Sequence, residues 1–243
     1  MLVQFTDYND AGRIIAKNFS RHWTEVNTVL SAMPLHLKGS LQKGISGQPI
    51  FDPVGTNAYI KDELVKAGWK PNLPIPPQFL GTDVDFAKQG VIVEVQFANY
   101  PFLLNNLLRS ELFFKSQTVF DQAPTQVLFY IVKSGMFPAS QSTLYYEQAR
   151  NQLTPLAQNG VFDIPIRLVG LLSPLNQKIP VELVGYSGRT SRTVNQRKQI
   201  TGIIQPRTGK RRRPQLTILE DDRPVAEAEA ESGRDSDSTP SSF

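Results

Sequence analysis

The sequence contains no cysteine and only two histidines among its 243 residues. Without cysteine, disulfide scaffolds, thiolate zinc sites and cysteine nucleophiles are excluded. Two histidines, His22 and His36, are too few for a histidine-rich metal cluster. His22 lies beside Trp23 in a segment of helical periodicity, which is typical of a packing or surface residue. We therefore expect no thiol chemistry and no general base catalysis by histidine.

Long apolar runs are also missing. No stretch approaches the roughly 20 apolar residues of a membrane-spanning helix. Residues 1–4 lack the charged and hydrophobic regions of a signal peptide. We expect a cytoplasmic protein with no membrane partner. The length suits one large domain, or one domain with a subdomain.

Acidic residues are scarce over most of the chain. Eight of the 22 acidic residues and two of the 26 basic residues lie in residues 220–243, a net charge of −6. Residues 1–219 therefore hold 14 acidic and 24 basic residues, a net charge of +10, which suits a polyanionic partner. The last segment has no aromatic residue before Phe243 and cannot bury enough apolar surface to fold. We predict a folded domain over residues 1–219 and an acidic, disordered tail over residues 220–243.

The clearest local pattern is a β-hairpin. Residues 91–98 alternate in character, so Glu94 and Gln96 share one face of a strand. Residues 82–88 are typical of a preceding strand, and Gln89-Gly90 of a two-residue turn in which glycine supplies the positive φ. The two strands are therefore expected to pair with each other.

This turn would place Asp85 opposite Glu94. With Lys88 paired to Val91, the two carboxylates face each other with about 5 Å between their Cβ atoms. Like charges in this position destabilise a sheet unless a cation neutralises them, and Mg²⁺ does so with few protein ligands and several waters. The alternative is an exposed ribbon with both carboxylates in solvent, because a one-residue shift of register would separate them. The pairing geometry leaves both interpretations open.

The spacing of these residues resembles a known catalytic core. Asp85, eight further residues and then Glu94-Val95-Gln96 resemble the PD-(D/E)xK nuclease superfamily, with glutamine in the place of the usual lysine. That exception is a mark of the BglII family of type II restriction endonucleases. Further segments that resemble this family are residues 51–57, 59–65, 100–106, 109–113, 136–140, 144–149 and 165–170. The resemblance extends over about residues 6–213.

The resemblance implies Mg²⁺-dependent hydrolysis of a phosphodiester. Asp85, Glu94 and the backbone carbonyl of Val95 would hold the metal or its waters, and the metal would lower the pKa of a bound water. Gln96 is neutral, so it would orient the attacking water or the phosphate without supplying a proton or a positive charge. Asn72 matches an active-site asparagine of the family and would also hold that water. From the sequence alone, Asn72 is more typical of a turn residue after a proline.

The resemblance also implies how DNA is read. The positions that match DNA-contacting residues of the family are Asn99, Arg109, Ser140, Gln141, Ser142, Thr190 and Arg192. Arg109 lies among apolar residues of a helix, where an arginine is usually snorkelling or ion-paired, but its fork also suits guanine O6 and N7. Ala98 and Thr190 stand where the family has serine and tyrosine, and Gln141 stands where it has asparagine.

One good base contact is worth roughly 1–3 kcal/mol of discrimination, so these departures bear on the recognition site. The implied site is a GATC-centred palindrome. We expect AGATCT, cut after the first A to leave a 5′ GATC overhang, with the degenerate site RGATCY as the close alternative.

A palindromic site implies a twofold homodimer in which each subunit cuts one strand of double-stranded DNA. The resemblance also implies a DNA methyltransferase of the same specificity as a functional partner. Two alternatives stay open. A DNA-binding protein without catalysis would be favoured only if Asp85 or Glu94 were missing. A structure-selective repair nuclease would share both carboxylates, but it would not cut a plasmid into discrete bands.

The order of the expected elements predicts an α/β fold with a mixed central β-sheet flanked by helices, and a smaller β-rich, DNA-contacting subdomain toward the C-terminus. Helices are expected over residues 9–32, from Thr56 or Asn57 to near Gly68, and over residues 101–120 and 143–159. Further strands are expected over residues 127–132, 164–172 and 180–186, with a loop-rich crossing over residues 34–55, an extended segment over residues 71–77 and short basic loops over residues 188–213. In the helix over residues 101–120, the inward side chains are expected to be Leu104, Leu107, Leu108, Leu112 and Phe113.

Overall fold

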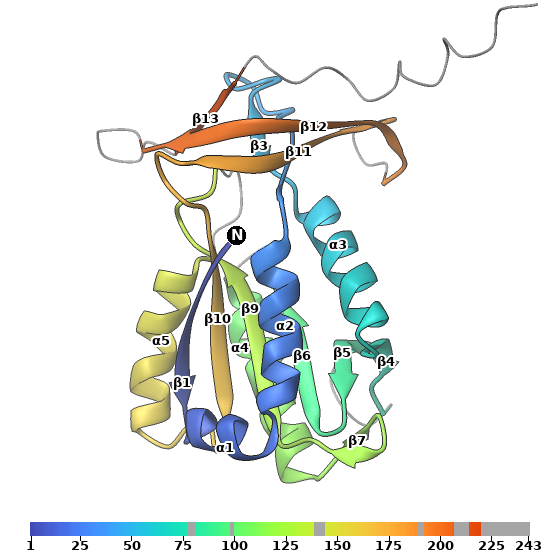
Figure 1. Ribbon diagram of the computed structural model, residues 1–243. Helices are drawn as coiled ribbons and strands as arrows, with labels where there is room; N and C mark the ends of the chain where they lie inside the picture. Colours follow the sequence, from blue (N-terminus) through green and yellow to red (C-terminus); the bar gives the residue numbers. More distant parts are fainter. Residues whose placement is uncertain (77–80, 98–99, 139–143, 189–191, 207–213, 220–243) are drawn as a thin grey trace, which may run out of the picture.

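The structure is a computed structural model that describes residues 1–76, 81–97, 100–138, 144–188, 192–206 and 214–219. The central sheet has the strand order β1-β10-β9-β6-β5-β4 (Figure 1). Its strands are β1 (Leu2–Tyr8), β4 (Lys70–Pro74), β5 (Asp83–Lys88), β6 (Val91–Val95), β9 (Val127–Lys133) and β10 (Ile166–Leu172). Strands β6, β9 and β10 run parallel, whereas β1, β5 and β4 pair antiparallel with their neighbours. The predicted mixed central sheet is therefore confirmed.

Helices cover both faces of the central sheet. One face is covered by α1 (Ala11–Asn18), α2 (Ser20–Ala32) and α3 (Pro53–Lys66), and the other by α4 (Pro101–Lys115) and α5 (Tyr146–Gln158). Successive side chains of β6 point to opposite faces of the sheet and pack against both groups of helices. Val91 and Val93 pack with the first group and Ile92 with the second. No helix in the described ranges is long and apolar enough to cross a membrane.

A second sheet lies across one end of this layered body (Figure 1). Its order is β13-β12-β11-β2-β3, formed by β2 (Leu35–Gly39), β3 (Pro49–Phe51), β11 (Lys178–Tyr186), β12 (Val194–Gln205) and β13 (Gln215–Ile218). A short separate hairpin consists of β7 (Val119–Phe120) and β8 (Ala123–Pro124). Leu37 and Val181 of the second sheet belong to the same buried cluster as Val93 and Phe129 of the central sheet. The predicted β-rich part is present and shares a core with the central sheet.

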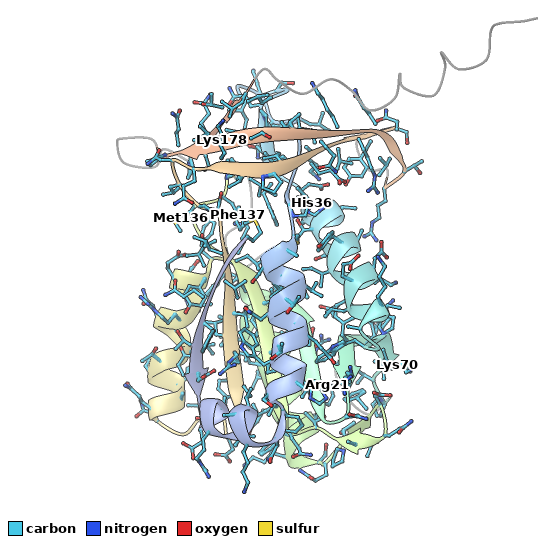
Figure 2. The ribbon with its side chains drawn as sticks, in the orientation of Figure 1. Arg21, His36, Lys70, Met136, Phe137 and Lys178 are labelled. Carbon is cyan, nitrogen blue, oxygen red and sulfur yellow. The ribbon has the colours of Figure 1, made fainter. Side chains whose placement is uncertain are left out.

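Residues Asp52 and His36 join the second sheet to α3. The carboxylate of Asp52 accepts hydrogen bonds from the first turn of α3 and from the hydroxyl of Tyr186 in β11. The ring of His36 lies 5.6 Å from that of Tyr59 in α3, centroid to centroid, and Figure 2 shows His36 where the two parts meet. The N-terminal half of α3 is therefore fixed by contacts to the second sheet.

Three sequence-based expectations about the N-terminal half were wrong. The helix expected over residues 9–32 is two helices, because the backbone leaves the helical region at Phe19, with φ of −131°. The next helix begins at Pro53 and not at Thr56 or Asn57, because the preceding aspartate caps it and proline suits its first position. The segment expected to be a loop-rich crossing contains β2 and β3.

The C-terminal part also differs from expectation. Residues 194–205, expected to lie in short basic loops, form the long strand β12, which pairs with β11. The expectation of short loops was wrong for these residues, because the pairing with β11 satisfies their backbone N–H and C=O groups. The tail predicted over residues 220–243 lies outside the described residues.

Helix α4 is shorter than predicted and ends at Lys115. Leu107 and Phe113 are buried, as expected. In contrast, Leu104, Leu108 and Leu112 are 37%, 57% and 40% exposed. The other buried residues of α4 are Leu103, Asn106 and Ser110. The apolar side chains of α4 therefore occupy two stripes, and only one of them faces the central sheet.

Strand β4 is the outer strand of the central sheet and pairs with β5. Lys70, labelled in Figure 2, begins this strand, and Pro71 and Pro74 lie within it. Proline has no backbone N–H, and it is tolerated at the edge of a sheet where no further strand needs that donor. Residues 71–74 of the segment predicted to be extended lie in β4, but the backbone of Asn72 departs from the extended conformation with φ of 51°.

Candidate active site

The hairpin of β5 and β6 has the predicted register. Gln89 and Gly90 form its turn, both with positive φ, of 43° and 92°. Lys88 pairs with Val91, and the ladder continues for two further pairs toward the open end of the hairpin. Because the pairing has this register, Asp85 and Glu94 lie at facing positions where the ladder ends. The predicted proximity of the two carboxylates is therefore present.

Where the backbone pairing between β5 and β6 ends, the side chain of Asp85 contacts β6 in its place. The Oδ2 atom of Asp85 accepts a hydrogen bond from the backbone N–H of Val95 at 2.7 Å. This contact fixes the carboxylate of Asp85 beside the last residue of β6. The carboxylate, the Val95 backbone and the following Gln96 are thus held together at the end of one strand.

Strand β4 adds a third polar residue. Pro71 pairs with Phe86 and Leu73 with Val84, so Asn72 occupies the position opposite Asp85. Asn72 has a positive φ of 51°, a conformation in which asparagine is enriched among non-glycine residues. Three neighbouring strands, β4, β5 and β6, therefore bring an amide and two carboxylates side by side.

Glu94 is almost completely buried, with 1% of its surface exposed. Its Oε1 atom accepts a hydrogen bond from Nη2 of Arg109 at 2.8 Å. Burial first, and the nearby charge of Asp85 second, raise the pKa of Glu94 to about 8, while the guanidinium of Arg109 opposes this rise. Burial also raises the pKa of Asp85, and the hydrogen bond from Val95 opposes that shift. Both shifts mean that the ionised carboxylates are disfavoured in this site, and a bound cation would stabilise their ionised forms.

Gln96 follows directly on β6. Its backbone N–H donates to the carbonyl of Ile131 in β9 at 2.9 Å, which continues the sheet pairing past Val95. Gln96 and Val95 are both half-buried. They lie at the carboxyl ends of parallel strands, an edge at which α/β proteins commonly bind ligands.

A cleft of about 580 Å³ opens beside these residues. Asn72, Asp85 and Val95 line it from the central sheet, and Arg192 lines it from the segment before β12. Helix α3 forms another wall, through residues that include Asn57 and Lys61. Sequence reasoning did not select these two residues. Their spacing of four on a helix was the available signal, because it places them on one face.

The structure places the predicted DNA-contacting residues unevenly. Arg192 lines the cleft, and its contact with DNA stays a prediction. Arg109 instead contacts Glu94, so the ion-paired alternative describes its contact here. The other predicted DNA contacts, which lie outside the described residues, are Asn99, Ser140, Gln141, Ser142 and Thr190.

The donor atoms suit a hard divalent cation. The described residues contain no group of three or more histidine, cysteine, aspartate or glutamate side chains arranged to hold a metal. Mg²⁺ does not need such a group, since it is commonly held by one or two carboxylates, waters and substrate phosphates. The carboxylates of Asp85 and Glu94 and the carbonyl of Val95 are oxygen donors of this kind. The residues present therefore fit Mg²⁺.

Comparison with known proteins identifies the family. Residues 3–171 match the family described as restriction endonuclease BglII/BglIII. The type II restriction enzyme BglII of Bacillus subtilis is 50% identical over 224 residues, which cover 90% of this chain and 99% of that enzyme. The crystal structure of BglII complexed with a DNA 16-mer has a TM-score of 0.85 and 49% identity, and that of free BglII has 0.71 and 45%. Each match covers 90% of this chain and 100% of the other. The chain therefore belongs to the BglII family of type II restriction endonucleases and is a site-specific endonuclease.

Proposed function

We propose that the enzyme hydrolyses double-stranded DNA with Mg²⁺ at a GATC-centred palindrome. The preferred site is AGATCT, cut after the first A to leave a 5′ GATC overhang, and RGATCY is the alternative. The observation that carries the proposal is the alignment of Asn72, Asp85 and Glu94 on three neighbouring strands beside a cleft. The relatedness to an enzyme whose structure is described as complexed with a DNA 16-mer supports the choice of substrate.

In the proposed mechanism, Asp85, Glu94 and the carbonyl of Val95 would hold Mg²⁺. That cation would supply neutralisation of the charge that develops on the phosphate and a lower pKa for a water. The hydrogen bond from Val95 keeps the carboxylate of Asp85 turned toward the cleft side of the hairpin. Because that contact is present before DNA binds, little reorganisation is needed when the phosphate arrives.

Two neutral side chains complete the proposed site. Gln96 orients the attacking water or the phosphate, and Asn72 holds the same water from the neighbouring strand. Neither amide exchanges a proton near neutral pH, so both act by position. The proton of the water passes to bulk solvent or to a phosphate oxygen, because no histidine lines the cleft among the described residues.

We propose that DNA is read by Asn99, Ser140, Gln141, Ser142, Thr190 and Arg192. Arg192 is supported by its position in the cleft, next to the catalytic strands. Arg109 contacts Glu94 through Nη2 alone among the described contacts, and a guanine contact would use its other donors or replace this one. The altered residues at positions 98, 141 and 190 bear most on the outer base pair, so the central GATC is the firmer part of the proposal.

A twofold homodimer follows from a palindromic site. The exposed stripe of Leu104, Leu108 and Leu112 on α4 supports it, because an apolar stripe of this length suits the matching stripe of a second copy. Each subunit would cut one strand. A DNA methyltransferase of the same specificity would protect host DNA from cleavage. We propose that the enzyme acts in the cytoplasm, where that DNA lies.

The test is to digest a mixed plasmid library with purified protein and Mg²⁺, beside an EDTA control, and to sequence the cut ends. Ends that all fall at GATC within one six-base palindrome support the proposal, and the flanking base separates AGATCT from RGATCY. Scattered ends would favour a structure-selective repair nuclease. Binding without cutting would favour a DNA-binding protein, and cutting that survives EDTA would contradict the role of the metal.

A further inference from the structure

Helix α3 has one face toward the core and another toward the cleft. The side chains of Thr56, Ile60 and Leu64 follow one another every four residues and are fully buried. Asn57 and Lys61 repeat with the same spacing one position further along, and both line the cleft. The cleft side of α3 therefore presents an amide and, one turn later, an ammonium group.

The ammonium group of Lys61 is available to a ligand. Lys61 is exposed, and no carboxylate in the described part of the chain pairs with it. Lys66 on the same helix differs, because its ammonium lies 2.6 Å from the carboxylate of Glu63. Lys66 also does not line the cleft. One helix therefore carries a lysine directed to the cleft and a lysine held by a neighbouring side chain.

The charges around the cleft are complementary to a metal-bound phosphate. Asp85 contributes negative charge from the sheet, whereas Lys61 and Arg192 contribute positive charge from two other walls. A phosphodiester needs both, since one oxygen faces the cation held by the carboxylates and other oxygens need donors. Gln96 is neutral, so the residue that follows Val95 on β6 supplies no ammonium group. Helix α3 supplies one from across the cleft.

We infer that Lys61, with Asn57 one turn before it, binds a backbone phosphate of the DNA strand that is cut. Lys61 makes a charge-assisted hydrogen bond to a non-bridging oxygen, and the amide of Asn57 donates a second bond to the same phosphate group. This contact is independent of base sequence and fixes the position of the strand over Asp85. The substrate named here rests on the proposed function, whereas the phosphate contact itself does not require cleavage.

The anchoring of α3 supports a positioning role. The N-terminal end of the helix is held to the second sheet by Asp52 and Tyr186, and its buried face is held to the central sheet. Lys61 therefore lies on an element whose place relative to Asp85 is set by the core. A phosphate that contacts Lys61 on one side and the cation held beside Asp85 on the other is held between two fixed walls, which is what in-line attack requires.

The experiment compares Lys61→Gln with Lys66→Gln, which removes the same charge from the same helix. The affinity for a 16-base-pair duplex that contains the site is measured without divalent metal, over a range of salt concentrations. For Lys61→Gln we expect the slope of log K against log salt to become shallower by about 0.9, the value for one lost phosphate contact. Lys66→Gln should keep the wild-type slope, and Lys61→Arg should restore it.

Single-turnover cleavage with Mg²⁺ gives a second readout. We expect Lys61→Gln to cut at least about tenfold more slowly at saturating enzyme, because a misplaced phosphate is attacked less efficiently. Asn57→Ala should show a smaller loss in the same direction. Both positions are exposed, so we expect each variant to fold. Thermal unfolding is the measurement that checks this.

A wild-type slope in Lys61→Gln, or an equal change in Lys66→Gln, would overturn the inference. These outcomes are separate from failure of the proposed function, because the salt slope is measured without metal and without cleavage. Suppose that the wild-type enzyme does not cut at GATC but Lys61→Gln still makes the slope of log K against log salt shallower. The phosphate contact then stands, and the proposed recognition site fails.

Discussion

The guanidinium of Arg109 donates a hydrogen bond to the carboxylate of Glu94 at 2.8 Å, and both side chains are largely buried. Gly81 lies against this guanidinium, and its backbone has φ of +105°. A side chain at position 81 would overlap Arg109. The absence of a side chain at Gly81 thus leaves room for the guanidinium of Arg109. The ion pair in turn favours the ionised form of Glu94, a proposed metal ligand.

Replacement of Arg109 with Gln should raise the pKa of Glu94 above its value of about 8, because the cation that opposes this rise among the described residues is lost. Ionised Glu94 is the proposed ligand. The rising limb of the pH dependence of single-turnover cleavage should therefore shift upward by at least about one pH unit. Arg13→Gln, which removes an exposed arginine paired with Asp10, is the control. A profile that stays in place would show that Arg109 does not set the ionisation of Glu94.

Replacement of Asp85 with Asn should lower the cleavage rate at least about a thousandfold, since a proposed metal ligand is lost. Affinity for DNA without metal should be kept or increased, because a negative charge facing the phosphate is removed. Cleavage assays and metal-free binding assays measure the two effects. Asp121→Asn, in the turn between β7 and β8, serves as the control. Cleavage near the wild-type rate would remove Asp85 from the mechanism.

Protonation of the two histidines is expected to lower the stability of the fold in acid. Burial lowers the pKa of both His22 and His36 below the value of about 6.5 that they have when unfolded. The unfolded chain therefore binds protons that the folded chain excludes, and stability falls as pH falls through about 6.5. His22→Gln should lose less in Tm between about pH 7.5 and pH 5.5 than the wild type does. Equal losses in the two proteins would show that His22 is not responsible.

Replacement of Leu108 with Glu should dissociate the proposed dimer, because it places a charge at the centre of the exposed stripe on α4. Sedimentation velocity should then report a monomer, and plasmid digestion should give nicked circles in place of linear DNA. Leu41→Glu is a matched control, since Leu41 is 66% exposed and lies in a loop away from α4. A Leu108→Glu protein that remains dimeric would place the interface elsewhere.

The hairpin register was predictable because its causes are local. Gln89-Gly90 fixes the turn, and the alternation of β6 admits one register that buries its valines. The role of Asn72 was suggested by family resemblance alone, and its position opposite Asp85 was not predicted. That position depends on the pairing of β4 with β5, which the sequence near Asn72 does not indicate.

Features that depend on distant segments were not predictable. Strand β1 was missed because its partner β10 pairs Leu2 with Leu172, and nothing near Leu2 in the sequence indicates that contact. The leucines of α4 were assigned to one apolar face, but a helix with two apolar stripes does not reveal which one the sheet covers. The position of α3 beside the cleft was missed for the same reason, since the other cleft residues lie 11 to 131 positions after Lys61 in the sequence.

The two prolines of β4 have a consequence for solubility. An exposed strand edge is a template on which another chain can add a strand, and such addition leads to aggregation. Pro71 and Pro74 remove backbone donors from this strand. The edge of β4 therefore offers fewer N–H donors to an added strand, which lowers the tendency of two copies of the protein to join through this edge.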